Sequence, residues 1–555
     1  MYRTYYARIQ ALLREYTGLE EVPLVDGSPH ADLATPVAFT LAKARRQSPV
    51  MIASGLADRL LPQLASSGII VETSGPYINF RFGTGVIQAS LREAVKPGYG
   101  SCPPGDERVV LEHTSANPNG PLHVGHIRNS IIGDTLARCF RKAGVRTEVQ
   151  YYVNDMGRQI AIVVWGFDHL GIPALPDEKE DHYVARVYIA ANREIEKDPA
   201  GITPAVDRLM QQVEQGDRDT ARRFRTAVSR CLDGFRVTMD RLNVRHDRFV
   251  WESDFIRNGD TNRLFSRIHR LPEYHEDGKV WIDLVAAGFE KEYVLRRSDG
   301  TSVYATRDLA YHIWKGKNFD RMIDILGADH KLIGAQLIAT LELIGEKAPT
   351  IVHFEFVSLP EGSMSTRAGK FVSADQLMDE VTARAFEEVT KRRPDLDEES
   401  RRRIARSVAI SGIRYDIVKI SPDKSTVFDW KEALDFERQS GPYIQYAHAR
   451  ACSILEKAGH FEHGYELTDD YEIALAKYIA RFPAEIDRVV TELRPHLLAA
   501  YARELADLFN TFYHFEPVLK AEGMTRQSRL TLVQATQNTL HEALETLGIE
   551  AIRTM

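Results

Sequence analysis

A strand, a kinked loop and a helix follow one another between residues 108 and 144, and this order constrains the fold more than any other feature. The apolar run RVVLEH is typical of a short buried strand. The loop TSANPNGPLHVGH follows, and apolar residues then recur at helical spacing from Ile127 to Phe140, until Gly144. In α/β sheets, anions bind where a loop leaves a parallel strand and enters a helix. We therefore predict a parallel sheet with an anion site after this strand.

Further along the chain, strand-like and helical stretches alternate, which is the pattern of a parallel sheet with crossover helices. Residues 171–243 are mostly helical and charged, and we expect them to form an insertion in this α/β domain. The strand-like stretches that follow the first one are TEVQYYVND, RMIDILG and IVHFEFV.

The two ends of the chain differ in pattern from this central part. Near the N-terminus, a helical segment is followed by two strand-like stretches around the turn Ser74-Gly75-Pro76, and then by a linker rich in proline and glycine. After about residue 395 the strand pattern is lost, and amphipathic helices indicate a helical bundle. We therefore predict an N-terminal α/β domain, a central α/β domain and a C-terminal all-α domain. Their expected ranges are residues 1–100, 101–395 and 396–555.

The composition indicates a globular protein of several domains, with 555 residues of which 44% are hydrophobic and 27% charged. Its apolar runs are far shorter than the roughly 18 residues of a membrane span, so we expect a cytoplasmic protein without membrane contact. The four cysteines are scattered, which argues against disulfides and zinc knuckles. Because the net charge is −7, any surface for nucleic acid would have to be a local basic patch.

His123 and His126 lie one turn apart where the loop enters the helix. Two imidazoles at a helix N-terminus can donate hydrogen bonds to one phosphate group, which suits a reaction whose transition state gathers charge on phosphorus. Gly125 leaves room for another group against the backbone. Zinc is the rival interpretation of paired histidines, but no cysteine cluster or HExxH motif is present to complete such a site.

HVGH resembles the HIGH signature of class I aminoacyl-tRNA synthetases and related nucleotidylyl transferases. Their second signature, KMSKS, has a partial match in EGSMSTRAGKFVS: Met364 and Ser365 agree, whereas Ser363 and Thr366 stand in place of the two lysines. With this departure, the chain resembles the arginyl-tRNA synthetase family in particular. Further matches, from residue 30 to the C-terminus, are HADLATPVAFTLAK, YVNDMGRQ, VYATRDLAY, SGPYIQYAHAR and LGIEAIRTM.

The resemblance implies an enzyme that ligates L-arginine to its cognate tRNA at the expense of ATP, through an arginyl-adenylate, with release of AMP and pyrophosphate. It also implies a Rossmann-like catalytic domain, an N-terminal domain that contacts the tRNA and a helical anticodon-binding domain. Mg²⁺ is expected with the ATP, held mainly by the phosphates, and no zinc or other metal site in the protein is expected. We expect a monomer.

The resemblance implies which residues bind the substrate arginine. The positions that match the arginine site are Glu112, Asn117, Tyr304 and Asp308. Two carboxylates suit a guanidinium group, which is always charged and carries five donors. Tyr304 and Asp308 share a face if their segment is helical. A simpler interpretation of Asp308 is a helix cap or a surface ion pair with Arg307. Asp329 and His330 occupy the neighbourhood of a further family position, and their role stays open.

The nucleotide and the tRNA have their own candidates. The positions that match the ATP site are His123, Gly125, His126, Met364, Ser365 and Thr366. Arg367 and Lys370 are candidates for the cation that replaces the missing lysine, and solvated loop charges are the simpler interpretation. Aromatic side chains beside arginine indicate base stacking. The candidates for tRNA contact are Tyr446, Arg450 and Asn510, whereas Phe509 and Phe512 are expected to be core residues.

Two other classes of protein share part of this pattern. An HxGH enzyme that transfers a nucleotide to a small acid would not need the long helical C-terminal domain. An RNA-binding relative without catalysis would be expected to have lost the histidines or the arginine site, and both are present. The sequence leaves open the anticodon nucleotides that are read, the replacing cation and the kinetic constants.

Overall fold

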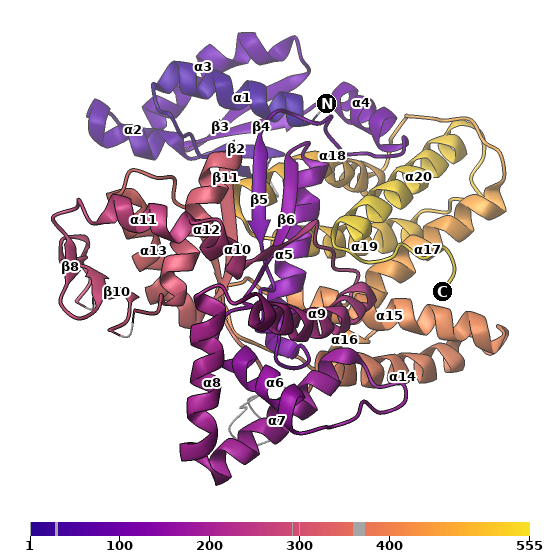
Figure 1. Cartoon of the computed structure of the whole chain (residues 1–555). Coiled ribbons are helices and arrows are strands. Elements are labelled where there is room, and N and C mark those ends of the chain that lie inside the picture. Colours follow the sequence, from indigo (N-terminus) through magenta and orange to yellow (C-terminus); the bar gives the residue numbers. More distant parts are fainter. Residues whose placement is uncertain (1, 28–30, 291, 299, 359–371) are drawn as a thin grey trace.

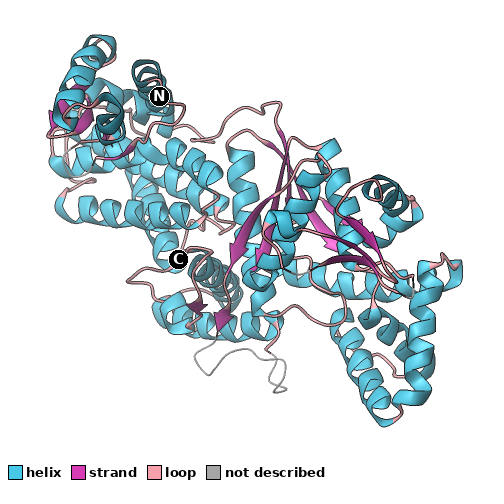
Figure 2. Ribbon diagram, turned by 90° about the vertical axis from the view of Figure 1, so that its left-hand side faces the viewer, coloured by secondary structure: helices cyan, strands magenta, loops and turns pink. Residues whose placement is uncertain are grey.

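The computed structural model describes residues 2–27, 31–290, 292–298, 300–358 and 372–555. A parallel sheet lies at the centre of the molecule (Figure 1; Figure 2). The N-terminal region, in indigo, lies at one end of this sheet, and the C-terminal helices lie along one side (Figure 1). No described helix is both long and apolar enough to cross a membrane.

The central sheet has five strands. They are β5 (Arg108–Glu112), β6 (Arg146–Val153), β7 (Arg248–Trp251), β11 (Arg321–Gly327) and β12 (Thr350–Phe354). All pairs are parallel, in the order β12-β11-β5-β6-β7. The strand order therefore reverses between β5 and β11, and ligands of such sheets bind at this switch point, beyond the carboxyl ends of the strands. The predicted parallel sheet is confirmed, and β7 is a strand that the sequence pattern does not reveal.

The helix after β5 positions the histidine turn. This helix, α5 (Val124–Lys142), ends before Gly144 as predicted. Its apolar residues Ile127, Ile131, Leu136 and Phe140 are fully buried. The predicted insertion is helical as well. Helix α6 (Arg158–His169) precedes the insertion. The helices of the insertion itself are α7 (Glu180–Lys197), α8 (Pro199–Glu214) and α9 (Arg218–Arg241).

A small antiparallel sheet of order β10-β9-β8, which the sequence pattern does not predict, lies at the left edge of the view in Figure 1, beside α11 and α13. Its strands, β8 (Tyr274–Glu276), β9 (Val280–Ile282) and β10 (Tyr293–Arg296), are too short to show an alternating pattern. The neighbouring elements are α10 (Glu252–Arg257), α11 (Asp260–Ile268), α12 (Tyr304–Asn318), α13 (Lys331–Leu343) and the 3-10 turns η1 (Val285–Ala287) and η2 (Ala328–His330).

The N-terminal region is an α/β unit with its own core. Its elements are α1 (Tyr2–Thr17), β1 (Val25–Asp26), β2 (Leu33–Thr35), α2 (Val37–Arg45), α3 (Pro49–Ala65), β3 (Ile69–Ser74), β4 (Tyr77–Phe82) and α4 (Thr84–Ala94). The antiparallel sheet has the order β1-β2-β4-β3. The predicted turn is confirmed: Ser74 pairs with Tyr77, and Gly75 has the positive φ of 58° that such a turn requires.

The C-terminal region is almost entirely helical. Its helices are α14 (Ala374–Arg392), α15 (Glu398–Val418), α16 (Trp430–Ala433), α17 (Gly441–Ala458), α18 (Asp470–Glu492), α19 (His496–Phe515) and α20 (Gly523–Thr546). One detail differs from the prediction, because strand β14 (Thr426–Val427) pairs with β13 (Val357–Ser358). Two residues are too few to show a strand pattern. Phe509 and Phe512 are fully buried, as expected of core residues.

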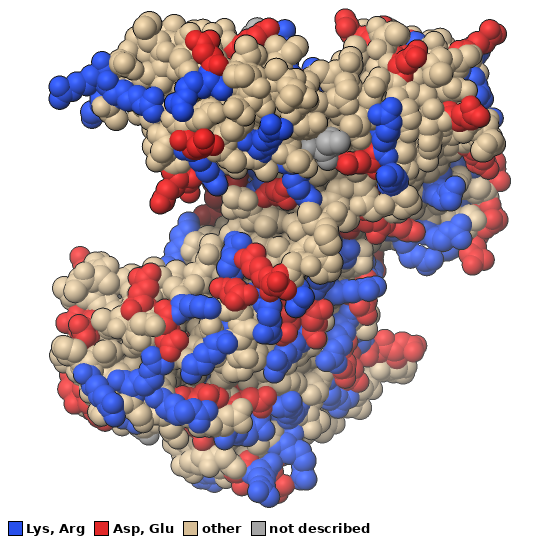
Figure 3. Space-filling view, turned by 90° about the horizontal axis from the view of Figure 1, so that it is seen from above, with Lys and Arg blue, Asp and Glu red and all other residues tan. Residues whose placement is uncertain are grey.

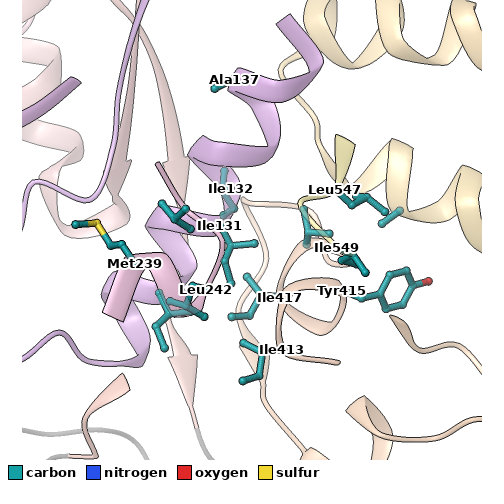
Figure 4. Close-up of a cluster of buried hydrophobic side chains, with 14 of the residues drawn as sticks. Ile131, Ile132, Ala137, Met239, Leu242, Ile413, Tyr415, Ile417, Leu547 and Ile549 are labelled. Carbon is teal, nitrogen blue, oxygen red and sulfur yellow. The ribbon is translucent and has the colours of Figure 1, made fainter. Parts of the chain in front are cut away.

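The C-terminal helices do not have a core separate from that of the central sheet. A single apolar cluster joins α5, α15 and the chain end (Figure 4). It includes Ile132 from α5, Ile413 and Ile417 from α15, and Leu547 and Ile549 after α20. A chain cut near residue 400 would expose this surface, so the all-helical region is not expected to be removable without loss of folding.

A buried ion pair reinforces the same junction. Arg414 on α15 is fully buried, and its guanidinium contacts the Asp134 carboxylate on α5 at 2.6 Å. It also donates to the backbone oxygens of Leu547 and Leu242, each at 2.8 Å. Gly548 has a φ of 73° and lies against this guanidinium, where a Cβ atom would meet Arg414 at 2.2 Å. Only glycine fits there.

We expect Arg414→Met to lower the free energy of unfolding by about 3 kcal/mol, because Asp134 and two carbonyl groups then stay buried with fewer partners. Arg402→Met on the same helix removes an exposed ion pair with Glu398 and a contact with the ring of Phe386, and it is expected to lower the free energy of unfolding by less than about 1 kcal/mol. Urea unfolding of both variants measures the difference. Equal stabilities would contradict a structural role of this pair.

Candidate active site

The two histidines form a cap at the start of α5. His123 is the N-cap residue: its Nδ1 accepts a hydrogen bond from the backbone N–H of His126, and Nδ1 of His126 accepts one from the backbone N–H of His123, each at 3.3 Å. The rings are stacked with centroids 3.6 Å apart. The arrangement is a capping box in which imidazoles replace the usual hydroxyl and carboxylate.

This cap fixes the protonation of both rings. A nitrogen that accepts a backbone N–H carries no proton, so each neutral ring has its proton on Nε2 and can donate it to a ligand. Burial, and to a lesser degree His123, lowers the pKa of His126 to about 3. Burial also lowers the pKa of His123. The pair therefore offers two neutral N–H donors at neutral pH, as the predicted phosphate contact requires.

Gly125 has a different neighbour from the one predicted. A Cβ atom at this position would lie 2.8 Å from Cε1 of His123, so the space beside the backbone is filled by the imidazole of the cap. The residue is needed for the geometry of the histidine pair. Contact with a nucleotide at Gly125 stays a prediction.

The histidine turn is tied to the segment that follows the second signature. The backbone N–H of Ala374 donates to the oxygen of Leu122 at 2.7 Å, and His123 forms an antiparallel bridge with Ser373. Strand order alone does not reveal this link across the chain. The predicted residues Met364, Ser365, Thr366, Arg367 and Lys370 lie outside the described residues.

The loop after β5 holds an unfavourable backbone conformation. Thr114 and Ser115 have φ angles of 70° and 35°, in the left-handed region that costs non-glycine residues of order 1 kcal/mol or more. Hydrogen bonds offset this cost: the N–H of Thr114 donates to Asn129 (2.9 Å), and the hydroxyl of Ser115 donates to Glu112 (3.0 Å) while accepting from the N–H of Tyr152 (3.1 Å). The loop thereby sets where Glu112 points.

The other residues predicted to bind arginine lie around the same edge. Asn117 accepts a hydrogen bond from Asn154 at 3.2 Å. Tyr304 is the first residue of α12, and Asp308 follows one turn later on the same face, as expected. Arg307 does not pair with Asp308, because it bonds to the buried carboxylate of Glu252. The simpler interpretation of Asp308, a surface pair with Arg307, is therefore wrong.

A buried charge network beneath this edge contains three residues that the sequence-based site lacks, Lys315, His312 and Asp324. Lys315, fully buried on α12, places its ammonium 3.0 Å from Glu112 and 2.8 Å from Asp324 on β11. His312 lies 2.7 Å from Asp324 and 3.0 Å from Asp308. The helical spacing of 308, 312 and 315 after Tyr304 is the signal that could have found these residues, since it places them on one face.

Three members of this network are spaced like metal ligands. Potential ligand atoms of Glu112, His312 and Asp324 lie within 4.8 Å of one another. The ammonium of Lys315 already contacts two of the three, so the chain's own cation balances the carboxylates there. We assign no metal to these residues.

A cavity of about 580 Å³ lies between α8 and the residues before α12, and Tyr304 and Asn154 are part of its wall. A second cavity, of about 190 Å³, shares Asn154 with it and includes Asn117. Two of the residues predicted to bind arginine, Asn117 and Tyr304, thus border open space, whereas Glu112 and Asp308 line neither cavity. Asp329 and His330 lie after β11 with exposed side chains, 3.1 Å apart.

The predicted tRNA residues also lie close together in the C-terminal region. The guanidinium of Arg450 on α17 lies over the half-exposed ring of Tyr446, 4.8 Å from its centre, and donates to Asn510 on α19 at 2.6 Å. The same guanidinium also lies 5.7 Å from the centre of the Tyr513 ring. An arginine in contact with tyrosine rings is a feature of surfaces that stack on bases.

Comparison with known proteins identifies the family. Three family models match consecutive parts of the chain: "Arginyl tRNA synthetase N terminal domain" at residues 8–82, "tRNA synthetases class I (R), catalytic domain" at 88–430 and "DALR anticodon binding domain" at 444–555. The chain belongs to the arginyl-tRNA synthetase family. The resemblance inferred from the two signatures is confirmed.

Similar proteins match this chain over its whole length. Arginine–tRNA ligase of Methanoregula boonei is 69% identical over 99% of both chains, and that of Methanosphaerula palustris is 62% identical over all of both chains. Among solved structures, arginyl-tRNA synthetase of Thermus thermophilus covers all of both chains with a TM-score of 0.89 and 32% identity. The class I architecture with a helical anticodon domain is thus confirmed.

The neutral state of His126 has a consequence for stability. Its pKa of about 3 in the fold lies below the unfolded value of about 6.5, so the unfolded chain binds the proton more tightly between these pH values. Stability gained from this group is complete above about pH 6.5 and falls by up to about 1.4 kcal/mol per pH unit towards pH 3. We expect His126→Gln to have a shallower acid dependence in urea unfolding between pH 4.5 and 7. An unchanged slope would mean that the ring takes up its proton at the same pH in the folded as in the unfolded chain.

Proposed function

We propose that the protein ligates L-arginine to its cognate tRNA with ATP, through an arginyl-adenylate, releasing pyrophosphate and AMP. Membership of the arginyl-tRNA synthetase family supports the reaction, and the capped histidine pair at the switch point is the observation that carries the chemistry. We further propose that the enzyme acts as a cytoplasmic monomer. The domain boundaries at residues 100 and 395 also remain proposals.

The α-phosphate of ATP binds at the start of α5 in this proposal. The Nε2–H groups of His123 and His126 donate to the phosphate oxygens, where negative charge increases as the arginine carboxylate attacks. Mg²⁺ is bound with the triphosphate and not by a protein cage. Met364, Ser365 and Thr366 cover the pyrophosphate, and Arg367 and Lys370 are the candidates for the cation that the signature lacks.

L-Arginine binds at the carboxyl edge of β5. Its guanidinium group lies between the carboxylates of Glu112 and Asp308, and Asn117 and Tyr304 complete the site. A site built to bond a charged, planar donor rejects lysine and neutral analogues, because they leave its buried polar groups without partners. No separate editing domain is needed for such discrimination.

The tRNA contacts the C-terminal helices and the N-terminal unit. The cluster of Tyr446, Arg450 and Asn510 provides a stacking surface for anticodon bases. Lys and Arg side chains gather over the lower part of the face in Figure 3, although the whole chain has a net charge of −7. A local basic surface of this kind is what an acidic protein needs to attract a polyanion.

The reaction is tested by incubating the purified protein with ATP, Mg²⁺, radiolabelled arginine and bulk tRNA. Arginine attached to tRNA is the expected product, and lysine should give none. Arginine adenylate or another nucleotide ester without charged tRNA would favour a nucleotidylyl transferase. RNA binding without turnover would favour a relative that has lost catalysis.

We expect His126→Ala to slow adenylate formation by about two to three orders of magnitude, because one donor to the transition-state charge is lost. The KM for arginine should change little. Single-turnover aminoacylation with tRNA present measures the effect, and circular dichroism checks the fold. Near-normal turnover would contradict the phosphate contact.

We expect Arg450→Ala to raise the KM for tRNA by about tenfold or more, since stacking and charge are both lost, and to leave the KM for ATP and arginine unchanged. Lys457→Ala is the matched control, because it removes the same charge from an exposed position on the same helix. Equal effects of the two variants would show that only net charge matters there.

A further inference from the structure

The charged groups beneath the arginine site form one chain of alternating sign. In contact order they are Glu112, Lys315, Asp324, His312 and Asp308. The contacts along this chain measure 3.0, 2.8, 2.7 and 3.0 Å. Both ends of the chain are carboxylates, and they are the two carboxylates that the proposed function gives to the substrate guanidinium.

The strand register explains why cations are needed at this place. Glu112 on β5 and Asp324 on β11 are directly paired positions of neighbouring parallel strands. Two buried carboxylates side by side repel each other, and one would take up a proton if no cation were present. The ammonium of Lys315 lies between them and accounts for the charge of one.

His312 has the equivalent place between the next two carboxylates. Burial and Lys315 disfavour its protonated form, but Asp308 and Asp324 outweigh them and raise its pKa to about 10. The ring is therefore a second cation at neutral pH. Three carboxylates and two cations leave one negative charge on the network.

We propose that Lys315 and His312 are positioning residues that set the charge of the arginine site. They hold Glu112 and Asp308, the carboxylates at the two ends of the row of charged groups, so that the guanidinium of one substrate molecule can contact both. The bound cation completes a ring of alternating charge with no net charge. This inference rests on the proposed arginine site, and it adds two residues that do not touch the substrate.

The geometry gives these residues a role beyond filling the core. If the side chain at position 315 served only to fill the core, an apolar residue would do so without the cost of desolvating a charge. A buried ammonium between two carboxylates therefore indicates an electrostatic role. Selectivity follows from the same charge count, because a neutral analogue such as citrulline leaves the ring open. The substrate must supply one positive charge.

The main test replaces Lys315 with methionine, which keeps an unbranched side chain one heavy atom shorter and removes the ammonium. Burial raises the pKa of Glu112 and the ammonium opposes this, so the variant's carboxyl should be protonated at neutral pH. The other ionisable groups around Glu112 are Asp324, His312, Asp308, Tyr152 and Tyr311.

The expected result is a rise of about ten- to hundredfold in the KM for arginine at pH 7, with the KM for ATP and for tRNA within twofold. This KM should fall as the pH increases from 6 to 9, because Glu112 regains its charge. The parent enzyme should show no such dependence. Lys317→Met, exposed on the same helix, is the matched control and should behave like the parent.

Variants of the end residues separate this inference from the proposed function. If Glu112→Gln and Asp308→Asn leave the KM for arginine unchanged, the arginine site itself is wrongly placed. If these variants raise it but Lys315→Met matches the parent in value and in pH dependence, the role of the network is wrong.

A double variant guards against a folding failure of Lys315→Met. Glu112→Gln combined with Lys315→Met removes both charges of the pair, and a neutral pair avoids the buried unpaired charge. Because Lys315 is proposed to act through Glu112, the double variant should have the same KM for arginine as Glu112→Gln alone, without pH dependence. A further tenfold loss in the double variant would overturn the inference.

Discussion

The contact of Lys315 with two carboxylates from neighbouring strands is the interaction on which the site depends. Parallel pairing of β5 with β11 creates the switch point, and the same pairing places Glu112 beside Asp324. Like charges at paired positions destabilise a sheet, so the strand order that makes a binding edge also creates a local electrostatic cost. Helix α12 meets this cost with Lys315 and His312, and it presents Asp308 about one turn and Tyr304 about two turns before His312. The scaffold and the site thus share one charged network.

The sequence predicts the parts of the fold that have a strong period. The strand–loop–helix unit around the histidines, the N-terminal hairpin and the long C-terminal helices are all present, since each has enough apolar residues to show its spacing. Strand β7 and the small sheet of β8 to β10 are not predicted. Strands of three or four residues have too few positions to distinguish alternation from chance. The long C-terminal helices are recognisable, but their shared core with α5 depends on contacts between distant residues that periodicity does not reveal.

The candidate site divides in the same way. His123, His126 and the four residues predicted to bind arginine are recognisable because they lie in short motifs. Lys315 and Asp324 are 203 and 212 positions from Glu112 in the chain, and only the strand order brings them together. A buried lysine looks like any basic residue in the last turn of a helix, where such residues are common. Its burial is a tertiary property, and so is the choice of Glu252 over Asp308 as the partner of Arg307.

The histidine turn and the charge network follow opposite electrostatic rules, and the difference suits the ligands that we propose for them. At the turn, burial keeps both imidazoles neutral, so that they donate hydrogen bonds without a fixed charge that would hold the anionic product. In the network, neighbouring carboxylates raise the pKa of His312 to about 10, so that the ring is a cation at neutral pH. The two sites lie on the same edge, and the strained loop of Thr114 and Ser115 connects them through Glu112. In its left-handed conformation the loop brings the hydroxyl of Ser115 to one carboxylate oxygen of Glu112, while the ammonium of Lys315 contacts the other, so the backbone strain is offset where the two features meet.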